Sequence, residues 1–387
     1  METIKTIKVK LYPNKHMKQV LDNICDYRRY CWNQGLETWN QMYDLHCINK
    51  SYKTPNERAV RNELVENKQD WQYKYSSRVL QQAISDLGNA WQHFLNKSKV
   101  DWGKPKFKTK KDTKQGFKSD RITIKNGKLK LDKPREVQEK WQNIKIKGLL
   151  KDCDINLTVV SITKVNNKYY ASLPYKTNIE TKVLTSKATA IDVNVGHFNY
   201  TDGNLNVLPK KLNFYYNRIK HYQRMLAKKR VINGKNACKS NNYLKVRTKL
   251  QRDYEKASNL THDILHKFTT MLTDKYDAIV IEDLDVKHMQ MTHVASKGLQ
   301  RSCFGLFRQL LTYKCNWYGK ELIIADRFYP STQRCSCCGH VKTGEDKITL
   351  SGNKKHKTKH NEYVCYKCGF TADRDYNAVM NLLALVN

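Results

Sequence analysis

Three acidic residues adjoin apolar stretches and are candidates for metal-dependent chemistry. Asp192 and Glu282 each close a run that predicts a buried strand, and Asp375 opens a run that predicts a helix. Cutting a phosphodiester requires charge stabilisation on the attacking and leaving oxygens, which two Mg²⁺ ions supply. Mg²⁺ prefers hard oxygen ligands, so a cluster of carboxylates fits it. Taken singly, an acid after a strand is more often a cap or a surface ion pair. We therefore expect a metal site only if the three acids converge.

Two cysteine pairs with metal-ligand spacing lie near the end of the chain. Cys335-x-x-Cys338 and Cys365-x-x-Cys368 are each followed by glycine, with 26 residues between the pairs. Two such pairs can place four thiolates tetrahedrally around one Zn²⁺, and a closed shell of this kind holds structure without performing hydrolysis. Cys337 or His340 is an alternative ligand, and redox chemistry is an alternative use. The polar stretch 351–360 is predicted to be the tip of a long hairpin.

Composition limits the class of partner. The 387 residues include 71 Lys and Arg against 36 Asp and Glu, a formal net charge of +35. Such an excess usually has an anionic polymer or surface to neutralise it, and nucleic acid is the leading candidate. A hydrophobic content of 40% is sufficient for folded cores. No apolar run is long enough to span a membrane, and the start of the chain lacks the apolar core of a signal peptide. Twelve cysteines without an export signal indicate a reducing compartment.

Two stretches concentrate the positive charge. Residues 97–135 contain 15 Lys or Arg and 4 acids, and residues 210–256 contain 15 Lys or Arg and 2 acids. Basic residues interleaved with aromatic ones suit phosphate neutralisation and base stacking, although a solvated charged loop is the alternative. The candidate nucleic-acid contacts are Lys104, Lys106, Phe107, Lys108, Lys110, Lys111, Lys228, Lys229 and Arg230.

Hydrophobic periodicity predicts the elements that carry these residues. Residues 3–11 alternate with period two, as a strand does, and further alternating runs between 121 and 174 complete a small sheet. Residues 15–96 show helical spacing and are then an insertion into this β unit. From 187 onward, buried strands alternate with helices, which predicts an α/β layer with parallel pairing. The helical pattern of 210–256 is broken near Asn233-Gly234.

Several motifs, in this order, make the chain similar to the TnpB proteins of insertion sequences, which are RNA-guided nucleases related to type V CRISPR effectors and to Fanzor proteins. The motifs that carry the resemblance are Gly103-Lys-Pro105-Lys-Phe107-Lys108, Ile191-Asp192, His262-Asp263-x-x-His266-Lys267, Ile281-Glu282-Asp283-Leu284, Tyr313-Lys314, Trp317-Tyr318-Gly319, Tyr329-Pro330-Ser331-Thr332, the two cysteine pairs, and Asp373-Arg374-Asp375-x-Asn377-Ala378.

The resemblance implies a fold and a division into domains. It implies an RNase H-like RuvC nuclease domain formed by 185–330 and 370–387, with a zinc ribbon at 331–369 inserted between its parts. It also implies a β-barrel-like wedge domain formed by 1–14 and 97–184, and a helical recognition domain at 15–96. The fold class expected is therefore α/β plus β.

The resemblance also implies a function. The chain would be a transposon-encoded or transposon-derived RNA-guided DNA endonuclease that cuts beside a short adjacent motif. Asp192, Glu282 and Asp375 would be the catalytic residues, holding two Mg²⁺ ions, and Cys335, Cys338, Cys365 and Cys368 would hold one structural Zn²⁺. The partners would be a guide RNA of the omega or right-end-element type and double-stranded target DNA, with no membrane. A monomer is favoured over a dimer, in the cytoplasm at the nucleoid or, in a eukaryote, in the nucleus.

Four alternatives stay open at this point. They are a miniature type V CRISPR effector of the same mechanism, an unguided structure-selective nuclease, a non-cleaving DNA-binding regulator or transposition accessory protein, and a transposase with its own strand-transfer chemistry.

The sequence also departs from the family pattern. Asn194 stands where many relatives have glycine, and Asp373 is expected to cap a helix. Asn377 is expected either to orient a metal-bound water or to satisfy main-chain groups. For Asp283 and Asp263, a structural role is favoured over one beside the metal ligands.

Overall fold

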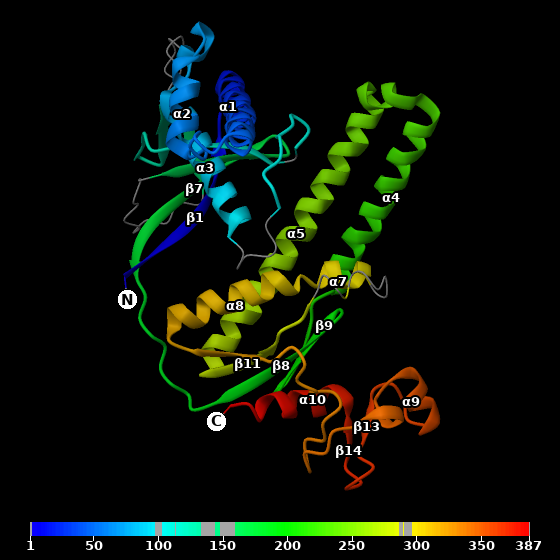
Figure 1. Ribbon diagram of the computed structural model, residues 1–387. Helices are drawn as coiled ribbons and strands as arrows, with labels where there is room; N and C mark the ends of the chain where they lie inside the picture. The colour runs from blue at the N-terminus through cyan, green and yellow to red at the C-terminus, as the bar shows by residue number, and fades with distance from the viewer. Residues whose placement is uncertain are drawn as a thin grey trace. The chain divides into compact units, whose positions relative to one another are not determined.

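The computed structural model describes residues 2–96, 103–112, 114–132, 144–147, 159–285, 289 and 296–386 (Figure 1). The ends of the first basic stretch, 97–102 and 133–135, and the start of the run at Leu157 lie outside the described residues. The chain divides into two compact units, residues 2–178 and residues 179–387. No helix among the described residues combines the length and hydropathy needed to cross a bilayer.

The first unit is built on an antiparallel sheet of seven strands in the order β2-β6-β7-β1-β5-β4-β3. Strand β1 pairs with β7 over ten residues, from Glu2 opposite Asn178 to Leu11 opposite Tyr169. The predicted strand at 3–11 therefore lies inside the sheet, between two partners. The strands are β1 (Glu2–Tyr12), β2 (Lys114–Ser119), β3 (Ile122–Lys125), β4 (Lys128–Leu131), β5 (Ile144–Lys147), β6 (Val160–Val165) and β7 (Lys168–Asn178).

The helices that the structure describes in the first unit fall between β1 and β2. They are α1 (Lys15–Ile48), α2 (Glu57–Glu66) and α3 (Ser77–Leu95), with a 3-10 turn at Asp70–Lys74. Asn14, Asn56 and Ser76 cap the three helices through side chains that accept main-chain N–H groups. One buried core joins the helices to the sheet, with Leu21 and Leu87 from helices beside Leu129 and Leu173 from strands.

The second unit contains a sheet of five strands in the order β10-β9-β8-β11-β12. Strands β8, β9 and β10 form an antiparallel meander, whereas β8, β11 and β12 run parallel. The mixed α/β content predicted for the chain is confirmed. The strands are β8 (Ala188–Asn194), β9 (His197–Tyr200), β10 (Gly203–Asn206), β11 (Ala278–Glu282) and β12 (Glu321–Ala325).

Helices cover both faces of this sheet (Figure 1). Side chains alternate between the two faces of a strand, so odd and even positions separate. Ile191 and Ile281 pack in a core with α5 (Asn241–Lys275) and α8 (Phe304–Tyr318). Ala190 and Val280 pack in another core with α10 (Arg374–Leu383). Two further helices are α4 (Lys210–Asn233) and α7 (Ser296–Ser302).

A small subdomain precedes α10, and it corrects one local prediction. It contains the two-stranded sheet of β13 (Glu362–Val364) and β14 (Thr371–Asp373) and the helix α9 (Leu350–Lys355). The hairpin tip predicted for 351–360 is wrong at its start, because α9 occupies 350–355. Thr349 begins this helix by accepting the N–H of Gly352 at 3.0 Å.

Candidate active site

Two parallel strands and one helix bring the three predicted acids to the same side of the five-stranded sheet. Asp192 and Glu282 occupy even positions, like Ala190 and Val280, so their side chains leave the sheet on the face that α10 covers. Asp375 lies in the first turn of α10. Each acid therefore comes from a different part of the chain, and the sheet register determines where they meet.

Asp192 is 7% exposed and lies close enough to Glu282 and Asp375 to interact with their charges. Burial, followed by the charges of Glu282 and Asp375, raises the pKa of Asp192 to about 7. Asn194, two residues along the same strand, donates its Nδ2 hydrogen to Asp192 Oδ2 at 2.6 Å and partly offsets this rise. The residue that departs from the family pattern thus orients the first acid.

Glu282 ends β11 and is held by a hydroxyl group from a distant loop. Ser331 Oγ donates to Glu282 Oε1 at 2.6 Å. Burial raises the pKa of Glu282, and the hydrogen bond from Ser331 lowers it in part. This carboxylate is therefore both desolvated and fixed in orientation.

Asp375 is held on both sides. Asn199 Nδ2 donates to its Oδ2 at 2.9 Å, and His197 Nε2 lies 3.4 Å from the same oxygen. Arg374 pairs with the other oxygen, its Nη2 lying 2.9 Å from Oδ1. Asp373 caps the helix by accepting the N–H groups of Asp375 and Tyr376, as the sequence predicts.

The electrostatic environment of Asp192 suits a divalent cation. Asp192 interacts with the charges of both other acids. Their oxygens are hard ligands of the kind that Mg²⁺ takes. They are not drawn tightly together, however: among the described residues, the group of at least three His, Cys, Asp or Glu with ligand atoms all within 4.8 Å is the four cysteines. Like charges repel, and each acid is instead held by its own polar neighbour.

The four predicted cysteines meet at one point. Cys335 and Cys368 sulfurs lie 3.8 Å apart, and those of Cys338 and Cys365 lie 3.7 Å apart. Four sulfurs at about 2.3 Å from one Zn²⁺ in a tetrahedron are separated by about 3.8 Å. The donor set therefore fits a structural zinc ion. Cys337 and His340 lie outside this group.

The two cysteine pairs adopt the same main-chain turn. Gly339 and Gly369 donate their N–H groups to Cys335 O and Cys365 O, each at 2.9 Å. Both glycines have φ of +73°, a region that side chains disfavour. The turn also aims N–H groups at sulfur, and those of Cys368 and Lys367 offset burial and lower the pKa of Cys365 to about 7. Main-chain N–H groups act in the same direction on Cys335, Cys338 and Cys368, whose pKa values burial and the neighbouring thiols nevertheless raise.

Three polar residues that the sequence analysis singled out have structural roles. Asn377 is fully buried and binds main chain on both sides, accepting from Ser336 N at 3.0 Å and donating to Arg334 O at 2.7 Å. Of its two expected roles, the structure therefore places it in the main-chain one. Asp283 pairs with Arg308 at 2.6 Å and with Arg327 at 3.0 Å. Asp263 pairs with Lys267 one helical turn away.

The predicted contacts at 104–111 lie on an extended segment that is attached to α1. Asn33 binds both main-chain groups of Lys108, at 2.8 and 3.0 Å. The Lys108 side chain is folded inward, with Nζ 3.4 Å from the centre of the Trp32 ring, and burial lowers its pKa to about 8. Lys110 pairs with Asp26 at 3.0 Å. Lys104, Lys106, Phe107 and Lys111 are exposed.

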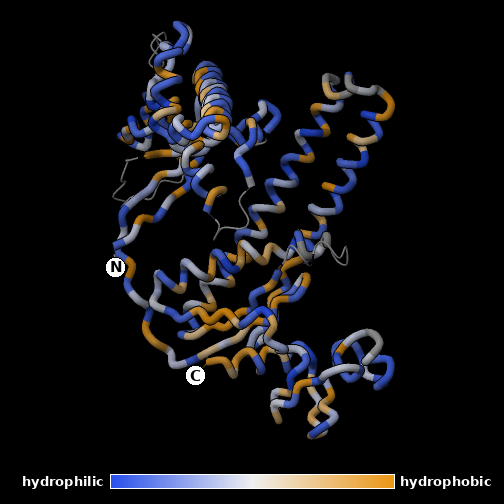
Figure 2. Tube along the Cα trace, viewed as in Figure 1, coloured by the Kyte–Doolittle hydropathy of each residue, from blue (hydrophilic) through white to orange (hydrophobic). Residues whose placement is uncertain are grey.

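The predicted contacts on α4 lie on a long helical hairpin formed with α5. Much of this hairpin is hydrophilic (Figure 2). Lys228 and Arg230 are exposed, and Lys229 is half-buried. Arg230 Nε donates to the Tyr243 hydroxyl at 2.9 Å, which connects the two helices. The hairpin presents cations along its length, and at least one of them also has a structural role.

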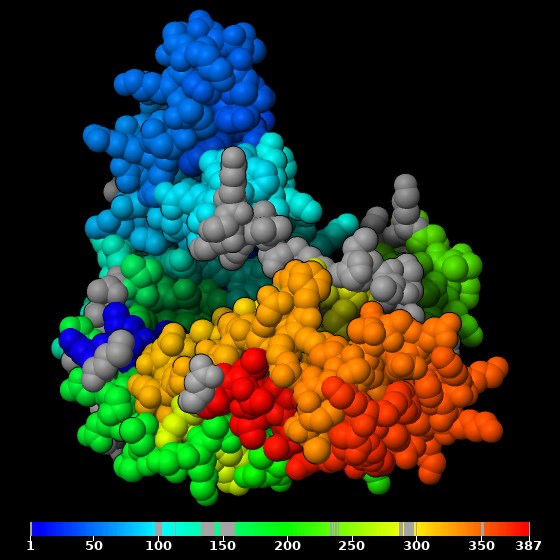
Figure 3. All heavy atoms as spheres, turned by 60° about the horizontal axis from the view of Figure 1, so that its bottom comes forward, coloured from blue at the N-terminus to red at the C-terminus, as the bar shows by residue number. Residues whose placement is uncertain are grey.

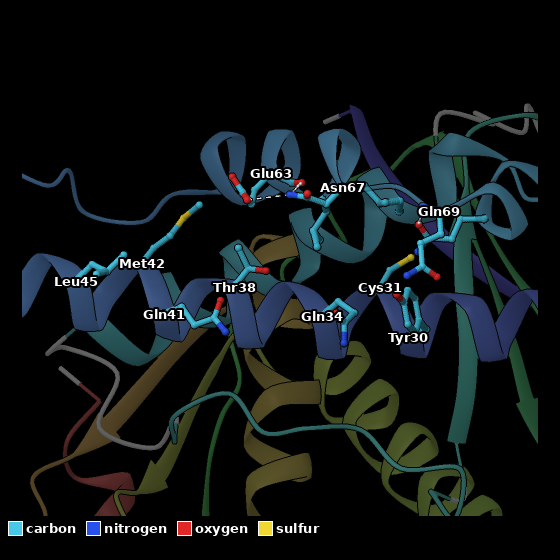
Figure 4. A pocket seen from close by; sticks show the side chains of 13 residues that line it. Tyr30, Cys31, Gln34, Thr38, Gln41, Met42, Leu45, Glu63, Asn67 and Gln69 are labelled. Atoms are coloured by element: carbon cyan, nitrogen blue, oxygen red, sulfur yellow. Dashed lines mark hydrogen bonds between the residues drawn. The ribbon is translucent and has the colours of Figure 1, made fainter.

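A polar cavity of about 510 Å³ lies in the first unit between α1, α2 and the turn that follows α2 (Figure 4). Its wall includes Tyr30, Glu63 and a set of amide side chains. Asn67 donates to Glu63 at 2.9 Å within it. The amides belong to Gln34, Gln41, Asn67, Gln69 and Gln72.

The sequence predictions missed the polar residues that orient the acids. Asn199 lies opposite Asp192 in the β8–β9 pairing, and Ser331 lies 49 positions from Glu282 in the chain. For Asn199, the strand pairing is a signal, because directly opposed residues project on the same face. For Ser331, no local pattern indicates the contact.

Comparisons with known proteins bear on the whole chain. Three family models match it in order: a helix-turn-helix domain of the OrfB_IS605 type at 1–46, the OrfB_IS605 model described as "Probable transposase" at 172–292, and the TNB domain of Cas12f1-like proteins at 304–382. Over residues 2–46 the structure has one strand and one long helix.

Curated relatives and one solved structure cover most of the chain. A Streptomyces pristinaespiralis protein named "Putative RNA-guided DNA endonuclease" is 29% identical over 80% of this chain and 71% of its own length. InsQ of Escherichia coli K12, with the same name, is 25% identical over 99% of this chain and 92% of its own. A Cas12f1 chain from a Cas12f1–sgRNA–target DNA complex is 14% identical and covers 98% of both chains at a TM-score of 0.48.

The three matched segments together span more than half of the sequence, and the motifs identified from the residues fall in the same order. The chain belongs to the TnpB family, the OrfB proteins of IS605-type elements.

Proposed function

We propose that this protein is an RNA-guided DNA endonuclease that cuts double-stranded DNA. Its catalytic residues would be Asp192, Glu282 and Asp375. The observation that carries the proposal is the convergence of these acids on the α10 face of the five-stranded sheet, where Asp192 interacts with the charges of the other two. The names of the two curated relatives support the same activity. The antiparallel meander followed by two parallel strands supports an RNase H-like, RuvC-type domain.

The acids would hold two Mg²⁺ ions, and the polar neighbours would set their orientation. Bound Mg²⁺ supplies charge stabilisation to both oxygens of the scissile phosphodiester. Asn194 holds Asp192, Ser331 holds Glu282, and Asn199 holds Asp375, so each carboxylate presents a defined oxygen. Arg374 restrains the second oxygen of Asp375. Orientation by neighbouring hydrogen bonds strengthens metal ligation.

The rest of the chain would bind nucleic acid and support the catalytic site. Residues 1–14 with 97–184 would form the wedge domain and 15–96 the recognition domain. The nuclease domain would comprise 185–330 and 370–387, with a zinc ribbon at 331–369. Exposed cations at Lys104, Lys106 and Lys228 suit an RNA or DNA backbone. The amide-lined cavity suits base edges, because Asn and Gln side chains pair with them.

The test combines copurified RNA with cleavage. The protein is expressed with its flanking genomic DNA, and the bound RNA is sequenced. A plasmid that carries the matching target beside randomised flanks is then cut, and the cut products reveal the adjacent motif. Cleavage that needs both the RNA and the matching target supports the proposal. Cutting without RNA indicates an unguided nuclease, and binding without cutting indicates a regulator or transposition accessory protein.

A second candidate is a miniature type V CRISPR effector of the same mechanism. The match of 304–382 to the TNB domain of Cas12f1-like proteins favours it. The copurified RNA separates the two: a transcript that overlaps the transposon end supports the first proposal, and a transcript with CRISPR repeats supports the second.

A further inference from the structure

Two buried asparagines on α10 bind the loop that carries the first cysteine pair. Asn377 and Asn381 lie one helical turn apart and are 0% and 3% exposed. Asn377 contacts Ser336 N and Arg334 O, and Asn381 Nδ2 donates to Ser331 O at 2.8 Å and to Arg334 O at 2.6 Å. All four contacts are to the main chain. They bind the loop whatever side chains it carries.

The same loop contacts the second acid. Ser331 accepts from Asn381 through its carbonyl and donates to Glu282 through its hydroxyl. Cys335 follows four residues later and is buried in the four-cysteine group. Tyr329, just before Ser331, donates its hydroxyl to Asn381 O at 2.8 Å. The loop 329–336 therefore connects the thiolates to Glu282 and to the helix that carries Asp375.

The arrangement is specific because buried amides are costly unless they are paired. A buried polar group without a partner destabilises the fold, so an asparagine in a core is maintained only where its hydrogen bonds are made. The loop binds Asn377 through both polar atoms of its amide and Asn381 through Nδ2. Figure 3 shows the C-terminal segments, orange to red, forming one continuous surface from the cysteine subdomain to α10.

We propose that Ser331, Asn377 and Asn381 are positioning residues that couple the four-cysteine centre to Glu282 and Asp375. With zinc bound, the four cysteines would hold the loop in place. The loop holds Glu282 through Ser331 and α10 through the asparagines, and carboxylates held in this way would bind a divalent cation more tightly. The coupling is reciprocal, as any linkage between two sites must be. It rests on the proposed function, since it assumes that the acids hold a cation.

The experiment measures cation affinity directly, without nucleic acid or cleavage. The full-length, zinc-loaded chain is titrated with Mn²⁺, and free Mn²⁺ is followed by electron paramagnetic resonance. Zinc content is measured in every sample by mass spectrometry. The variants are S331A, N381L and the double variant. The matched control is S336A, because Ser336 contributes its main-chain N–H to the network and a Ser→Ala change leaves that group in place. Asp192→Ala is the reference for the carboxylate site.

We expect S331A to retain one zinc and to weaken Mn²⁺ binding about tenfold or more, because a hydrogen bond to a charged group is lost. N381L should weaken it by a similar factor. In the double variant, the fold-loss of Mn²⁺ affinity should be smaller than the product of the two single losses, because both changes act through the same loop. S336A should bind as the unchanged protein does.

The outcomes separate the two proposals. Unchanged Mn²⁺ affinity in zinc-loaded S331A overturns the coupling, even if N381L loses its zinc, because S331A removes only the contact with Glu282. An equal loss in S331A and S336A also overturns it. If the unchanged protein binds no Mn²⁺, or if Asp192→Ala binds it equally well, the carboxylate metal site itself is wrong.

Discussion

The thiolate and carboxylate centres of the second unit are built in opposite ways. The four cysteines come from two short turns with identical main-chain hydrogen bonds, and their sulfurs lie within 4.8 Å of one another. The three acids come from two strands and a helix, remain farther apart, and each depends on a different neighbour. The thiolate site is preorganised by local turns, whereas the carboxylate site is organised by the tertiary fold.

The two centres therefore depend on different parts of the structure in order to form. A turn that aims N–H groups at sulfur needs only a few adjacent residues, so it can form wherever the chain brings two such turns together. The acids need a correct strand register, a packed α10 and the loop at 329–336 at the same time. Burial of Asp192 and Glu282 also raises the pKa of both, so the fold holds these carboxylates at a cost to stability.

The largest effect should come from removing one acid. We expect Asp192→Ala to reduce guided cleavage by about 10³-fold or more, because a cation ligand at the reacting phosphate is lost. The measurement is single-turnover cleavage of a matched plasmid. Asp263→Ala is the control, since this exposed acid pairs with Lys267 on the surface of α5. Comparable losses in both variants would contradict the assignment of the site.

Loss of the four-cysteine centre should lower the activity of the carboxylate centre, although none of the three acids is changed. Cys368→Ser is expected to lose zinc and to lower cleavage by about 10²-fold, because the loop and α10 lose their support. Zinc content, thermal unfolding and cleavage are measured together. Cys337 lies between the two cysteines of the first pair but outside the metal-binding group, so Cys337→Ser should retain all three properties. Full activity of zinc-free Cys368→Ser would show that the two centres are independent.

The stability cost of the carboxylate centre should be visible in its pH dependence. The pKa of Asp192 is raised to about 7 in the fold, so the folded state binds more protons than the unfolded state between about pH 4 and 7. Stability is therefore lost as pH rises through this window. Asp192→Asn should stabilise the chain by on the order of 2 to 3 kcal/mol at pH 8, and by progressively less toward pH 4.

Denaturant unfolding of both proteins, without added Mg²⁺ and without chelators that would remove zinc, measures this difference. Comparing the two proteins at each pH cancels the titration of the cysteines. A stabilisation that did not change between pH 8 and pH 5 would mean that burial and the neighbouring acids do not raise the pKa of Asp192 in the folded protein.

The smallest effect should come from the countercharge of the thiolate centre. Lys342 is 2% exposed and lies over the rings of Tyr366 and Tyr363 at 4.1 and 4.7 Å. It interacts with the charges of Cys365, Asp346 and Cys335, so the cysteines share this cation with one carboxylate. Lys342→Met should speed zinc release to a chelator by about threefold, in line with a modest charge interaction. Lys367→Met removes an exposed cation from the same subdomain and should have no effect.

Much of this architecture can be predicted from the residues, because periodicity is a local property. The strands that carry Asp192 and Glu282, the two cysteine pairs and the capping role of Asp373 all follow from patterns within about ten positions. The helix at 350–355 was missed because a polar stretch with glycine resembles a loop until the cap at Thr349 is seen.

What could not be predicted depends on contacts between distant segments. The bond from Ser331 to Glu282 and those from Asn381 to the loop join residues about 50 positions apart. The inward fold of Lys108 onto Trp32 likewise depends on tertiary packing, because the sequence shows a basic stretch but not which of its cations are free. Composition therefore predicts the partner class better than the individual contacts.

The β8–β9 hairpin limits where the chain can be lengthened. Asn194 pairs with His197 across a two-residue turn, and Gly196 is bound on both sides, to Ser302 Oγ at 3.1 Å and to Val207 N at 3.0 Å. One inserted residue would turn Asn199 to the opposite face and separate it from Asp375. A protein domain inserted into this turn would therefore be expected to abolish cleavage. The far end of α4, where Val231 and Ile232 are 86% and 78% exposed, offers an insertion point remote from the acids.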